Sequence, residues 1–428
     1  MPLPLPLRQM LVPYLLMVTA GTALGQAAPS VPTGPGTLVV MGGAVKEGNE
    51  ALWQAVVQAA GGPGQRVLIL PTASADPQRT AGLTAEQLQR RGALTEVLPI
   101  APRWPGSSLD DARARAHDAR WVALIDSARG VWLTGGEQDR LMDVLRPAGR
   151  DTPVLAALRA LLARGGVIAG TSAGAAVMSE TAIRGLDDPF DALLRPLDSQ
   201  ELGTGFGLAP LELVTDQHFL KRGRVARLVR VLLQSGRPLG LGVEEDSAAV
   251  LRDGTVQAIG ARGLLIIDSS AAQVQQAAPL AVRGLRLSYV DRGDRFDLKA
   301  RRLLTPATRT PLQPGRLQGQ PGFFGDILGD NLIVGALAHA AEADGRLALG
   351  LAWRPTQAIG FEWRIGLDEQ TRAFGGPTRD DHSFERLWLD IGPVRMAQPV
   401  YSAWPAGADR GAAPAATGTA ASAPVPPR

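Results

Sequence analysis

The stretch GGVIAGTSAGAAVMS, residues 165–179, joins an apolar run to a series of small residues, with Ser172 at the junction. Gly166 to Ala169 is typical of a buried strand, and the run that starts at Ala173 is compatible with a helix. Gly170-Thr171-Ser172-Ala173-Gly174 has the small-x-Ser-x-small form of a nucleophile elbow, in which small neighbours make room for a strained serine. The same pattern also suits a plain, tightly packed turn between a strand and a helix. The motif alone therefore leaves both interpretations open.

Short apolar runs alternate with helical patterns on the N-terminal side of this stretch. The sequence predicts strands at residues 37–41, 66–70, 97–100, 130–134 and 166–169, and helices at 50–60, 85–91, 119–127 and 152–164. Such an alternation indicates βαβ units and a buried parallel sheet with helices on both faces. We therefore expect an α/β fold with a mostly parallel sheet flanked by helices.

Beyond Gly240 the pattern shifts toward strands. The sequence predicts strands at residues 241–251, 256–259 and 264–267, and we expect them to extend one edge of the sheet as antiparallel strands. Further strand character occurs at residues 347–353 and 359–365. The fold class expected is thus α/β with an additional β-rich C-terminal extension.

The two ends of the chain differ in composition from the rest. Arg8 precedes an apolar run, and Ala23-Leu24-Gly25 is a small-x-small cleavage site, so residues 1–25 have the pattern of a secretory signal peptide; an uncleaved membrane anchor is the alternative. We expect a linker at 26–36, a catalytic domain at 37–278, a C-terminal extension at 279–404 and a disordered tail at 405–428. The mature protein is then secreted, in a periplasm or outside the cell.

Composition excludes several classes of function. The 428 residues carry a formal net charge of only +3, which argues against a nucleic-acid partner. The chain has no cysteine, so disulfides, cysteine nucleophiles and cysteine metal sites are excluded. Its four histidines, of which His218 is one, form no HExxH or comparable spacing. We expect neither a metal nor a cofactor.

A serine nucleophile needs a base and an orienting acid, and both follow later strand-like runs. His218 follows the run Leu213 to Thr215, and Glu244 and Glu245 follow Gly240 to Val243. Catalytic groups gather at the carboxyl ends of strands, which favours a catalytic role for His218 over a structural one. The chain order serine, histidine, acid argues against an α/β-hydrolase.

A glycine pair ends an earlier strand-like run, in Val131-Trp132-Leu133-Thr134-Gly135-Gly136-Glu137-Gln138. Glycines at a strand end let a ligand approach the backbone closely. The N–H groups of Gly136 and Ala173 can together form an oxyanion hole. A plain tight turn is the alternative.

Four motifs in this order resemble the cyanophycinase branch of the S51 serine peptidases, which also contains dipeptidase E. They are Gly135-Gly136-Glu137-Gln138, Gly170-Thr171-Ser172-Ala173-Gly174, Asp216-Gln217-His218-Phe219 and the strand ending at Glu245. The resemblance spans roughly residues 37–267. It implies a fold like that of class I glutamine amidotransferases, with serine replacing cysteine, and a triad of Ser172, His218 and Glu245. The family usually has Asp-Glu at Glu244-Glu245, so Glu244 remains an alternative acid; strand alternation lets only one of the two face His218.

The resemblance also implies a polar, basic substrate pocket. Its residues here would be Gln138, Asp216, Gln217, Arg222, Arg224 and Arg227. Arginines can bind carboxylates bidentately, and Asp216 can bind a guanidinium. The members of the family suggest a homodimer.

The function expected is that of a secreted serine-type exopeptidase. The resemblance implies hydrolysis of cyanophycin (multi-L-arginyl-poly-L-aspartate) to β-Asp-Arg dipeptides through an acyl-enzyme. One alternative is an S51 peptidase that acts on other aspartyl or isoaspartyl peptides. Another is an inactive secreted binding protein of the same fold. The extension at 279–404 has no counterpart that indicates its role.

Overall fold

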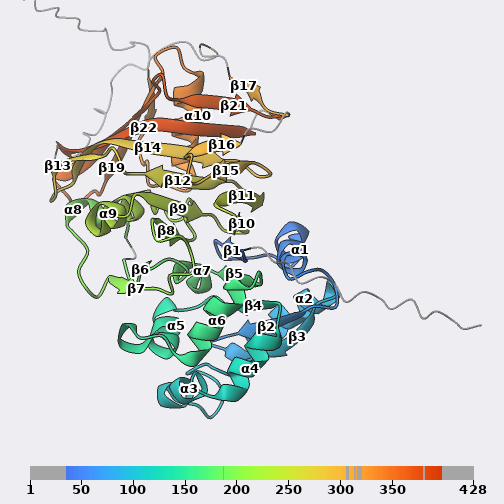
Figure 1. Cartoon of the computed structure of the whole chain (residues 1–428). Helices are drawn as coiled ribbons and strands as arrows, with labels where there is room; N and C mark the ends of the chain where they lie inside the picture. The colour runs from blue at the N-terminus through green and yellow to red at the C-terminus, as the bar shows by residue number, and fades with distance from the viewer. Residues whose placement is uncertain are drawn as a thin grey trace, which may run out of the picture.

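The computed structural model describes residues 35–186, 188–304, 308–312, 315, 321–378 and 381–397. The expected signal peptide at 1–25, nearly all of the linker at 26–36 and the tail at 405–428 lie outside these residues. Figure 1 shows an elongated molecule in which an α/β half, formed by the N-terminal part of the chain, is joined to a β-rich half. No helix in the described part of the chain is long and apolar enough to cross a membrane.

The first sheet has nine strands within the described residues, in the order β16-β15-β11-β10-β1-β5-β4-β2-β3. They are β1 (Thr37–Met41), β2 (Arg66–Leu70), β3 (Leu94–Val97), β4 (Gly130–Leu133), β5 (Val167–Thr171), β10 (Ser247–Arg252), β11 (Thr255–Gly260), β15 (Arg295–Asp297) and β16 (Arg302–Leu304). Strands β1 to β5 pair in parallel. The other four continue the sheet beyond β1 as antiparallel strands.

Helices cover both faces of the parallel part. They are α1 (Glu50–Ala59), α2 (Pro77–Arg90), α3 (Leu109–Arg115), α4 (Ala119–Ser127), α5 (Gln138–Leu145) and α6 (Pro153–Ala163), with a short 3₁₀ turn, η1 (Pro147–Gly149). Because side chains alternate along β1, Val39 and Met41 pack with α1 and α2, whereas Leu38 and Val40 pack with α3 to α6. The expected parallel sheet flanked by helices is confirmed.

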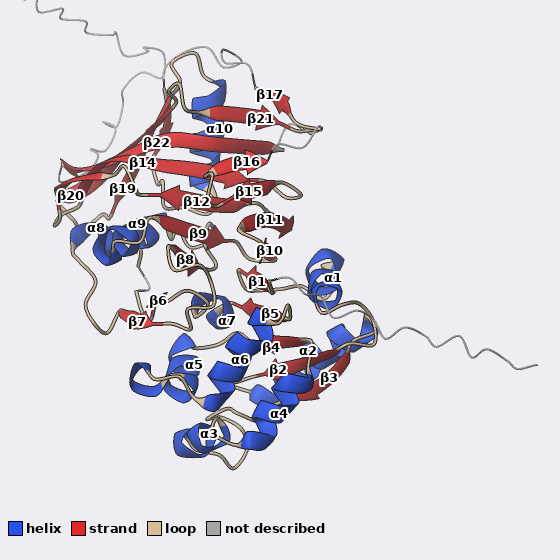
Figure 2. Cartoon of the chain, viewed as in Figure 1, coloured by secondary structure: helices blue, strands red, loops and turns tan. Residues whose placement is uncertain are grey.

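The second sheet has eleven strands within the described residues, and its main path runs β18-β19-β20-β22-β14-β12-β9-β8. They are β8 (Leu213–Asp216), β9 (Leu239–Val243), β12 (Leu264–Asp268), β13 (Gln273–Gln276), β14 (Ala281–Val290), β17 (Thr310–Pro311), β18 (Gly322–Phe324), β19 (Leu347–Trp353), β20 (Ile359–Gly366), β21 (Arg372–Gly375) and β22 (His382–Arg395). Helices α8 (Asp191–Leu194), α9 (Val225–Ser235) and α10 (Leu332–Glu342) pack on one face of this sheet (Figure 2). This confirms the β-rich C-terminal region.

The remaining elements lie between the two large sheets in the chain. They are the single-turn helix α7 (Ala173–Ala176) and a hairpin of β6 (Thr181–Ile183) and β7 (Leu202–Thr204). The two large sheets approach each other where β1 and β9 end: a Cβ on Gly42 would lie 2.0 Å from the carbonyl oxygen of Glu244. The junction of the sheets is therefore closely packed at the carboxyl ends of these strands.

Two expectations about the strands beyond Gly240 are wrong. Residues 241–251 form not one strand but the ends of β9 and β10, which belong to different sheets. The break occurs at the turn that ends with Asp246, whose φ of +53° is in the left-handed region that an extended residue rarely adopts. The strands beyond Gly240 also do not extend a single edge, since β10 and β11 join the first sheet and β12 joins the second.

The segment after residue 278 contributes to both sheets. Strands β15 and β16 join the first sheet, whereas β14 and the strands from β17 onward join the second. The boundary predicted at 278/279 falls between β13 and β14, which pair with each other as one hairpin. The extension therefore shares its sheets with the strands that carry the site residues.

Candidate active site

The loop after β1 holds three strand ends through consecutive backbone carbonyls. Each carbonyl accepts one backbone N–H: Met41 from Ser172 (3.0 Å), Gly42 from His218 (2.8 Å) and Gly43 from Asp246 (2.8 Å). Ser172 follows β5 in the first sheet, whereas His218 and Asp246 follow β8 and β9 in the second. The end of β1 thereby fixes the distance between groups that lie on different sheets.

Ser172 lies at a strained bend between β5 and α7, with φ +51° and ψ −111°. The small residues around it are required by close approach, because a Cβ on Gly170 would lie 2.4 Å from the carbonyl oxygen of Gly174. A Cβ on Gly174 would in turn lie 2.5 Å from that of Leu133. Strain of this kind persists only where the surroundings over-determine it, as at functional sites.

Three polar side chains form a hydrogen-bonded chain at this bend. The Oγ of Ser172 lies 3.0 Å from Nε2 of His218, and Nδ1 of His218 lies 2.6 Å from Oε1 of Glu245. His218 also has a positive φ, +48°, so the backbone is strained at both ends of the serine–histidine contact. This is the geometry in which a base can accept the hydroxyl proton while a carboxylate holds its tautomer.

Glu244, the alternative acid, points away from His218. Its carboxylate accepts the backbone N–H groups of Lys221 (2.7 Å) and Glu245 (2.7 Å). Burial raises the pKa of Glu244, and these backbone hydrogen bonds act in the opposite direction. Glu244 thus holds the turn that follows His218, and of the two carboxylates it is Glu245 that contacts the imidazole.

The protonation of His218 is set by opposing influences. Burial lowers the pKa of His218 below the ordinary value of 6.5, the hydrogen bond with Glu245 raises it, and the positive charges of Arg222 and Arg224 lower it. The net direction is downward. The imidazole is therefore neutral at neutral pH and able to accept a proton.

We expect kcat/KM to rise with pH through the pKa of His218 in the free enzyme, with an acid limb centred below pH 6.5. In Arg222→Ala a positive charge near the imidazole is lost, protonation becomes easier, and the limb should move to higher pH. Arg222→Lys keeps the charge and should leave the limb in place. A pH profile of kcat/KM measures this shift independently of any loss of substrate affinity. An unmoved limb in Arg222→Ala would contradict it.

The glycine pair at the end of β4 lies against the serine. A Cβ on Gly135 would lie 3.3 Å from Cβ of Ser172, and Gly136 has a φ of +138° with no room for a side chain beside Ala73. Gly136 is exposed, and the N–H of Ala173 is the first of α7, so it has no partner within the helix. Helix α7 has a single turn, so the backbone N–H rather than a helix dipole is what it offers to an oxyanion.

Three of the expected substrate residues are buried and engaged with one another. Asp216 is 1% exposed, and its Oδ2 accepts from Nε of Arg227 at 2.8 Å. Nη1 of Arg224 donates to the carbonyl of Gln217 at 2.6 Å and lies 3.8 Å from Asp216. The structure therefore does not present Asp216, Arg224 or Arg227 to solvent; they hold the segment before His218 in place.

The other three expected substrate residues differ in their surroundings. Arg222 is exposed beside His218. Gln217 is buried, and its Oε1 has no hydrogen-bond partner among the described residues. Nε2 of Gln138 donates to the carbonyl of Ile183 at 3.1 Å and to that of Arg184, so Gln138 ties α5 to β6. Substrate contact by Arg222 and Gln217 stays a prediction.

Two features of the site were missed by the sequence analysis. Gly43, with φ +106°, packs on the imidazole: a Cβ there would lie 2.4 Å from Cε1 of His218. A glycine pair after a strand is the same signal that singled out Gly135-Gly136 and could have found Gly42-Gly43. The C-terminal region also reaches this turn, since Asp330 pairs with Lys221 at 2.7 Å and Asn331 donates to the carbonyl of Leu220 at 3.2 Å. No sequence pattern indicated that contact.

We expect Gly43→Ala to lower kcat/KM by about a hundredfold, because the added methyl must displace the imidazole from Ser172. The control is Gly64→Ala, where φ is +82° but a Cβ meets nothing within 4 Å. That change introduces backbone strain of about 1 kcal/mol without any contact. Kinetics should show lost activity only in Gly43→Ala, and thermal melts measure how far the backbone strain alone destabilises each variant. Equal activity in both variants would contradict the contact.

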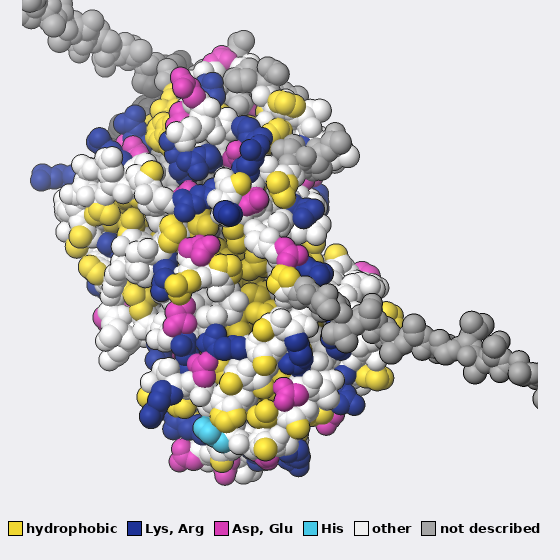
Figure 3. Space-filling view, viewed as in Figure 1, with side chains coloured by type: hydrophobic (Ala, Val, Ile, Leu, Met, Phe, Trp, Pro, Cys, Tyr) yellow, Lys and Arg dark blue, Asp and Glu magenta, His cyan; other side chains and the backbone are white. Residues whose placement is uncertain are grey.

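Within the part of the chain that the structure describes, no group of three or more His, Asp or Glu side chains could hold a metal ion. On the face in Figure 3, Lys and Arg side chains are interspersed with Asp and Glu over both halves of the molecule.

The arrangement defines a hydrolase with a serine at a strained elbow, and the comparisons agree. The family model of peptidase family S51 matches residues 38–259. The chain therefore belongs to peptidase family S51 and is a serine-type peptidase.

Its curated relatives include cyanophycinases. That of Nostoc sp. (strain PCC 7120 / SAG 25.82 / UTEX 2576) is 35% identical over 256 residues, 57% of this chain and 78% of the relative. That of Geminocystis herdmanii (strain PCC 6308) is 32% identical over 277 residues, 61% and 94% of the two chains. Among solved structures, a peptidase from an acI-B1 Actinobacterium aligns with a TM-score of 0.44 at 21% identity, covering 58% of this chain and 94% of that one.

Proposed function

We propose that this protein is a cyanophycinase: a serine-type exopeptidase that hydrolyses cyanophycin to β-Asp-Arg dipeptides. The hydrogen-bonded chain from Ser172 through His218 to Glu245 carries the proposal. Two comparisons support it: the S51 family model matches residues 38–259, which contain all three residues, and the chain is 35% identical to a cyanophycinase over 256 residues. Cyanophycin is a poly-aspartate backbone whose β-carboxyls carry arginine, so each cleavage site presents carboxylate and guanidinium groups.

In the proposed mechanism, Oγ of Ser172 attacks the carbonyl carbon of a backbone amide and gives its proton to Nε2 of His218. The N–H groups of Gly136 and Ala173 donate to the oxyanion. The C–N bond then breaks, and His218 returns the proton to the leaving amine. A water attacks the acyl-enzyme with its proton passing to His218; the ester bond then breaks, His218 returns the proton to Oγ of Ser172, and a carboxylate is released. Glu245 stabilises the imidazolium throughout.

The carboxylates of the substrate are complementary to the positive charge of Arg222, an exposed residue close to His218. Arg222 is exposed on the turn that follows His218, where it can bind a substrate carboxylate bidentately. Asp216 and Arg227 stabilise each other below this turn, so we assign them a positioning role in place of substrate contact. We also propose that the enzyme is exported, as the signal pattern at residues 1–25 indicates.

The test is incubation of the purified protein with cyanophycin and quantification of the released dipeptide by mass spectrometry. We expect β-Asp-Arg from the wild type and none from a variant without the Ser172 hydroxyl. Cleavage of isoaspartyl dipeptides without cleavage of the polymer would replace this function with that of a different S51 peptidase. Tight polymer binding without turnover, equal in both forms, would identify a binding protein.

A further inference from the structure

A pocket lies on the β-rich half of the molecule, away from Ser172. It has a volume of about 540 Å³, within the range of ligand sites in proteins. Its lining comes from β13, β14, β20 and β22 and includes Arg283, Glu362, Arg364, Asp390 and Gly392. Helix α10 packs on the opposite face of these strands. The pocket is therefore a hollow in the face of the second sheet that α10 does not cover.

The uncovered face follows from the alternation along the strands. In β20, Phe361, Trp363 and Ile365 are buried against α10, whereas Glu362 and Arg364 point the other way. Nearer the opposite margin of the sheet, in β12, both faces are buried. The sheet thus changes from a two-sided core near the active site to a one-sided layer at the pocket.

The pocket presents charges of both signs that form no ion pair among the described residues. Within the described residues, Arg283, Arg364 and Glu362 make no ion pair or side-chain hydrogen bond. Asp390 accepts only the backbone N–H of Gly284, at 2.8 Å, although it lies opposite Arg364 in the register of β20 and β22. Elsewhere on the same sheet, arginines do find carboxylates, as Arg286 does with Asp368 at 2.6 Å. The four charged ends are therefore available to a ligand.

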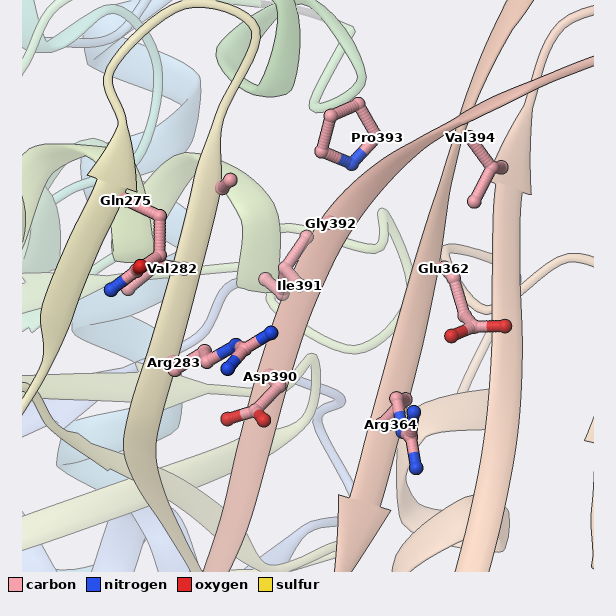
Figure 4. A pocket seen from close by; sticks show the side chains of 11 residues that line it. Gln275, Val282, Arg283, Glu362, Arg364, Asp390, Ile391, Gly392, Pro393 and Val394 are labelled. Atoms are coloured by element: carbon pink, nitrogen blue, oxygen red, sulfur yellow. The ribbon is translucent and has the colours of Figure 1, made fainter. Parts of the chain in front are cut away.

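Figure 4 shows how these groups are placed. Arg283 and Asp390 lie side by side on β14 and β22, and Glu362 and Arg364 lie on the next strand. Between these side chains the floor of the pocket is formed by a residue without a side chain, Gly392, which lies opposite Glu362 in register. A Cβ on Gly392 would meet nothing within 4 Å, so the space above it is open. A peptide backbone can lie on this floor with its charged side chains toward either strand.

The pocket is separate from the site at Ser172. Strand β22 lies four positions from β8 in the sheet order β22-β14-β12-β9-β8. At about 4.8 Å per strand this is roughly 19 Å across the sheet. The pocket also lies at the other end of the strands: Val243 is level with Leu264 and Val290, whereas Arg283 lies seven residues back along β14, about 24 Å at 3.4 Å per residue. The two sites are therefore about 31 Å apart, and roughly nine residues of an extended polymer would bridge them.

We propose that this pocket is an accessory site for the polymer substrate. It binds a segment that carries both carboxylate and guanidinium groups, while another segment of the same molecule occupies the active site. The inference rests on the proposed function and deepens it, because it gives the C-terminal region a role in polymer capture. Arg283 and Arg364 bind substrate carboxylates, and Glu362 and Asp390 bind guanidinium groups. Two linked contacts raise the apparent affinity for a polymer without changing the chemistry at Ser172.

The first experiment measures binding of the full chain to insoluble cyanophycin by co-sedimentation, with Ser172→Ala as the parent so that the polymer stays intact. We expect Arg283→Ala/Arg364→Ala to weaken binding by about tenfold. The matched control is Arg295→Ala/Arg302→Ala, which removes the same charge from exposed positions on β15 and β16 of the other sheet. Equal binding by the parent and the pocket variant would overturn the proposal, as would equal loss in both double variants.

The second experiment fills the pocket without changing any charge. Gly392→Leu places a side chain in the open space above the floor and should weaken binding to a similar extent. Its control is Gly82→Leu on the exposed side of α2, where a Cβ also meets nothing within 4 Å. Unchanged binding in Gly392→Leu would overturn the proposal even if the arginine variant binds poorly.

A third measurement separates this inference from the proposed function. In enzymes with Ser172 intact, the pocket variants should slow dipeptide release from the insoluble polymer and leave the hydrolysis of a short soluble substrate unchanged. Equal loss on both substrates would show damage to the active site and overturn the accessory site. Failure of the wild type to release dipeptide overturns the proposed function instead, whatever the binding assay gives.

Discussion

Ser172→Ala should lower kcat for dipeptide release by about five to six orders of magnitude, the cost of removing a serine nucleophile from a triad. The variant loses only Oγ, which lies 3.0 Å from Nε2 of His218. The strained backbone is unaffected, because its N–H still donates to Met41 and alanine meets the same restriction at φ +51° as serine. The folded state should therefore keep its melting temperature while turnover disappears.

This prediction is measured by dipeptide release under single-turnover conditions and by labelling with a serine-directed fluorophosphonate. The label should attach at Ser172 in the wild type and be absent from Ser172→Ala. The control is Ser127→Ala, which removes an exposed hydroxyl at the end of α4 and should leave both readouts unchanged. A variant without Oγ that retained a tenth of the wild-type rate would exclude Ser172 as the nucleophile.

Glu245→Gln should lower kcat by about three to four orders of magnitude, because a neutral amide cannot stabilise the imidazolium and favours the wrong tautomer. The carboxylate of Glu245 accepts a hydrogen bond from Nδ1 of His218 at 2.6 Å. In Glu245→Gln a neutral side-chain amide takes the place of this carboxylate. Loss of the negative charge also makes protonation of His218 harder. The acid limb of kcat/KM should therefore move to lower pH, opposite to its movement in Arg222→Ala.

The neighbouring Glu244→Gln is the matched control, since it makes the same chemical change one residue away. Each oxygen of Glu244 accepts a backbone N–H, whereas an amide can accept at only one of the two positions. We expect a loss of about 1–3 kcal/mol in the free energy of unfolding, with most of the activity retained. Kinetics with denaturant unfolding separate the two effects. A larger loss of activity in Glu244→Gln than in Glu245→Gln would reverse the assignment of the acid.

Much of the first sheet could be predicted because its signals are local. The strands at 37–41 and 66–70 and the helix at 119–127 have the expected bounds. Each is an uninterrupted run whose periodicity is visible within a few residues. The strand at 241–251 could not be predicted correctly, because a continuous apolar pattern conceals the left-handed residue Asp246, where the chain passes from one sheet to the other.

The residues of the candidate triad could be predicted from the sequence, whereas several hydrogen bonds and ion pairs around them could not. Ser172, His218 and Glu245 each follow a strand, and strand ends are recognisable in a sequence. The pairing of Asp216 with Arg227 was not, because it depends on the turn that brings the start of α9 back beneath β8. The contact of Asp330 with Lys221 joins residues 109 positions apart, and no periodicity carries that information.

The sequence by itself determined the α/β class, the elbow at Ser172 and the order of the groups after it, because strand and helix periods and small residues act over short distances. Only the tertiary structure decided which carboxylate faces His218, which arginines reach solvent and where the C-terminal strands lie. Those outcomes depend on backbone angles at the strand ends and on pairing between strands distant in the chain. The physical reason is visible at Met41, Gly42 and Gly43, whose carbonyls hold three segments of the site that meet only when both sheets have formed.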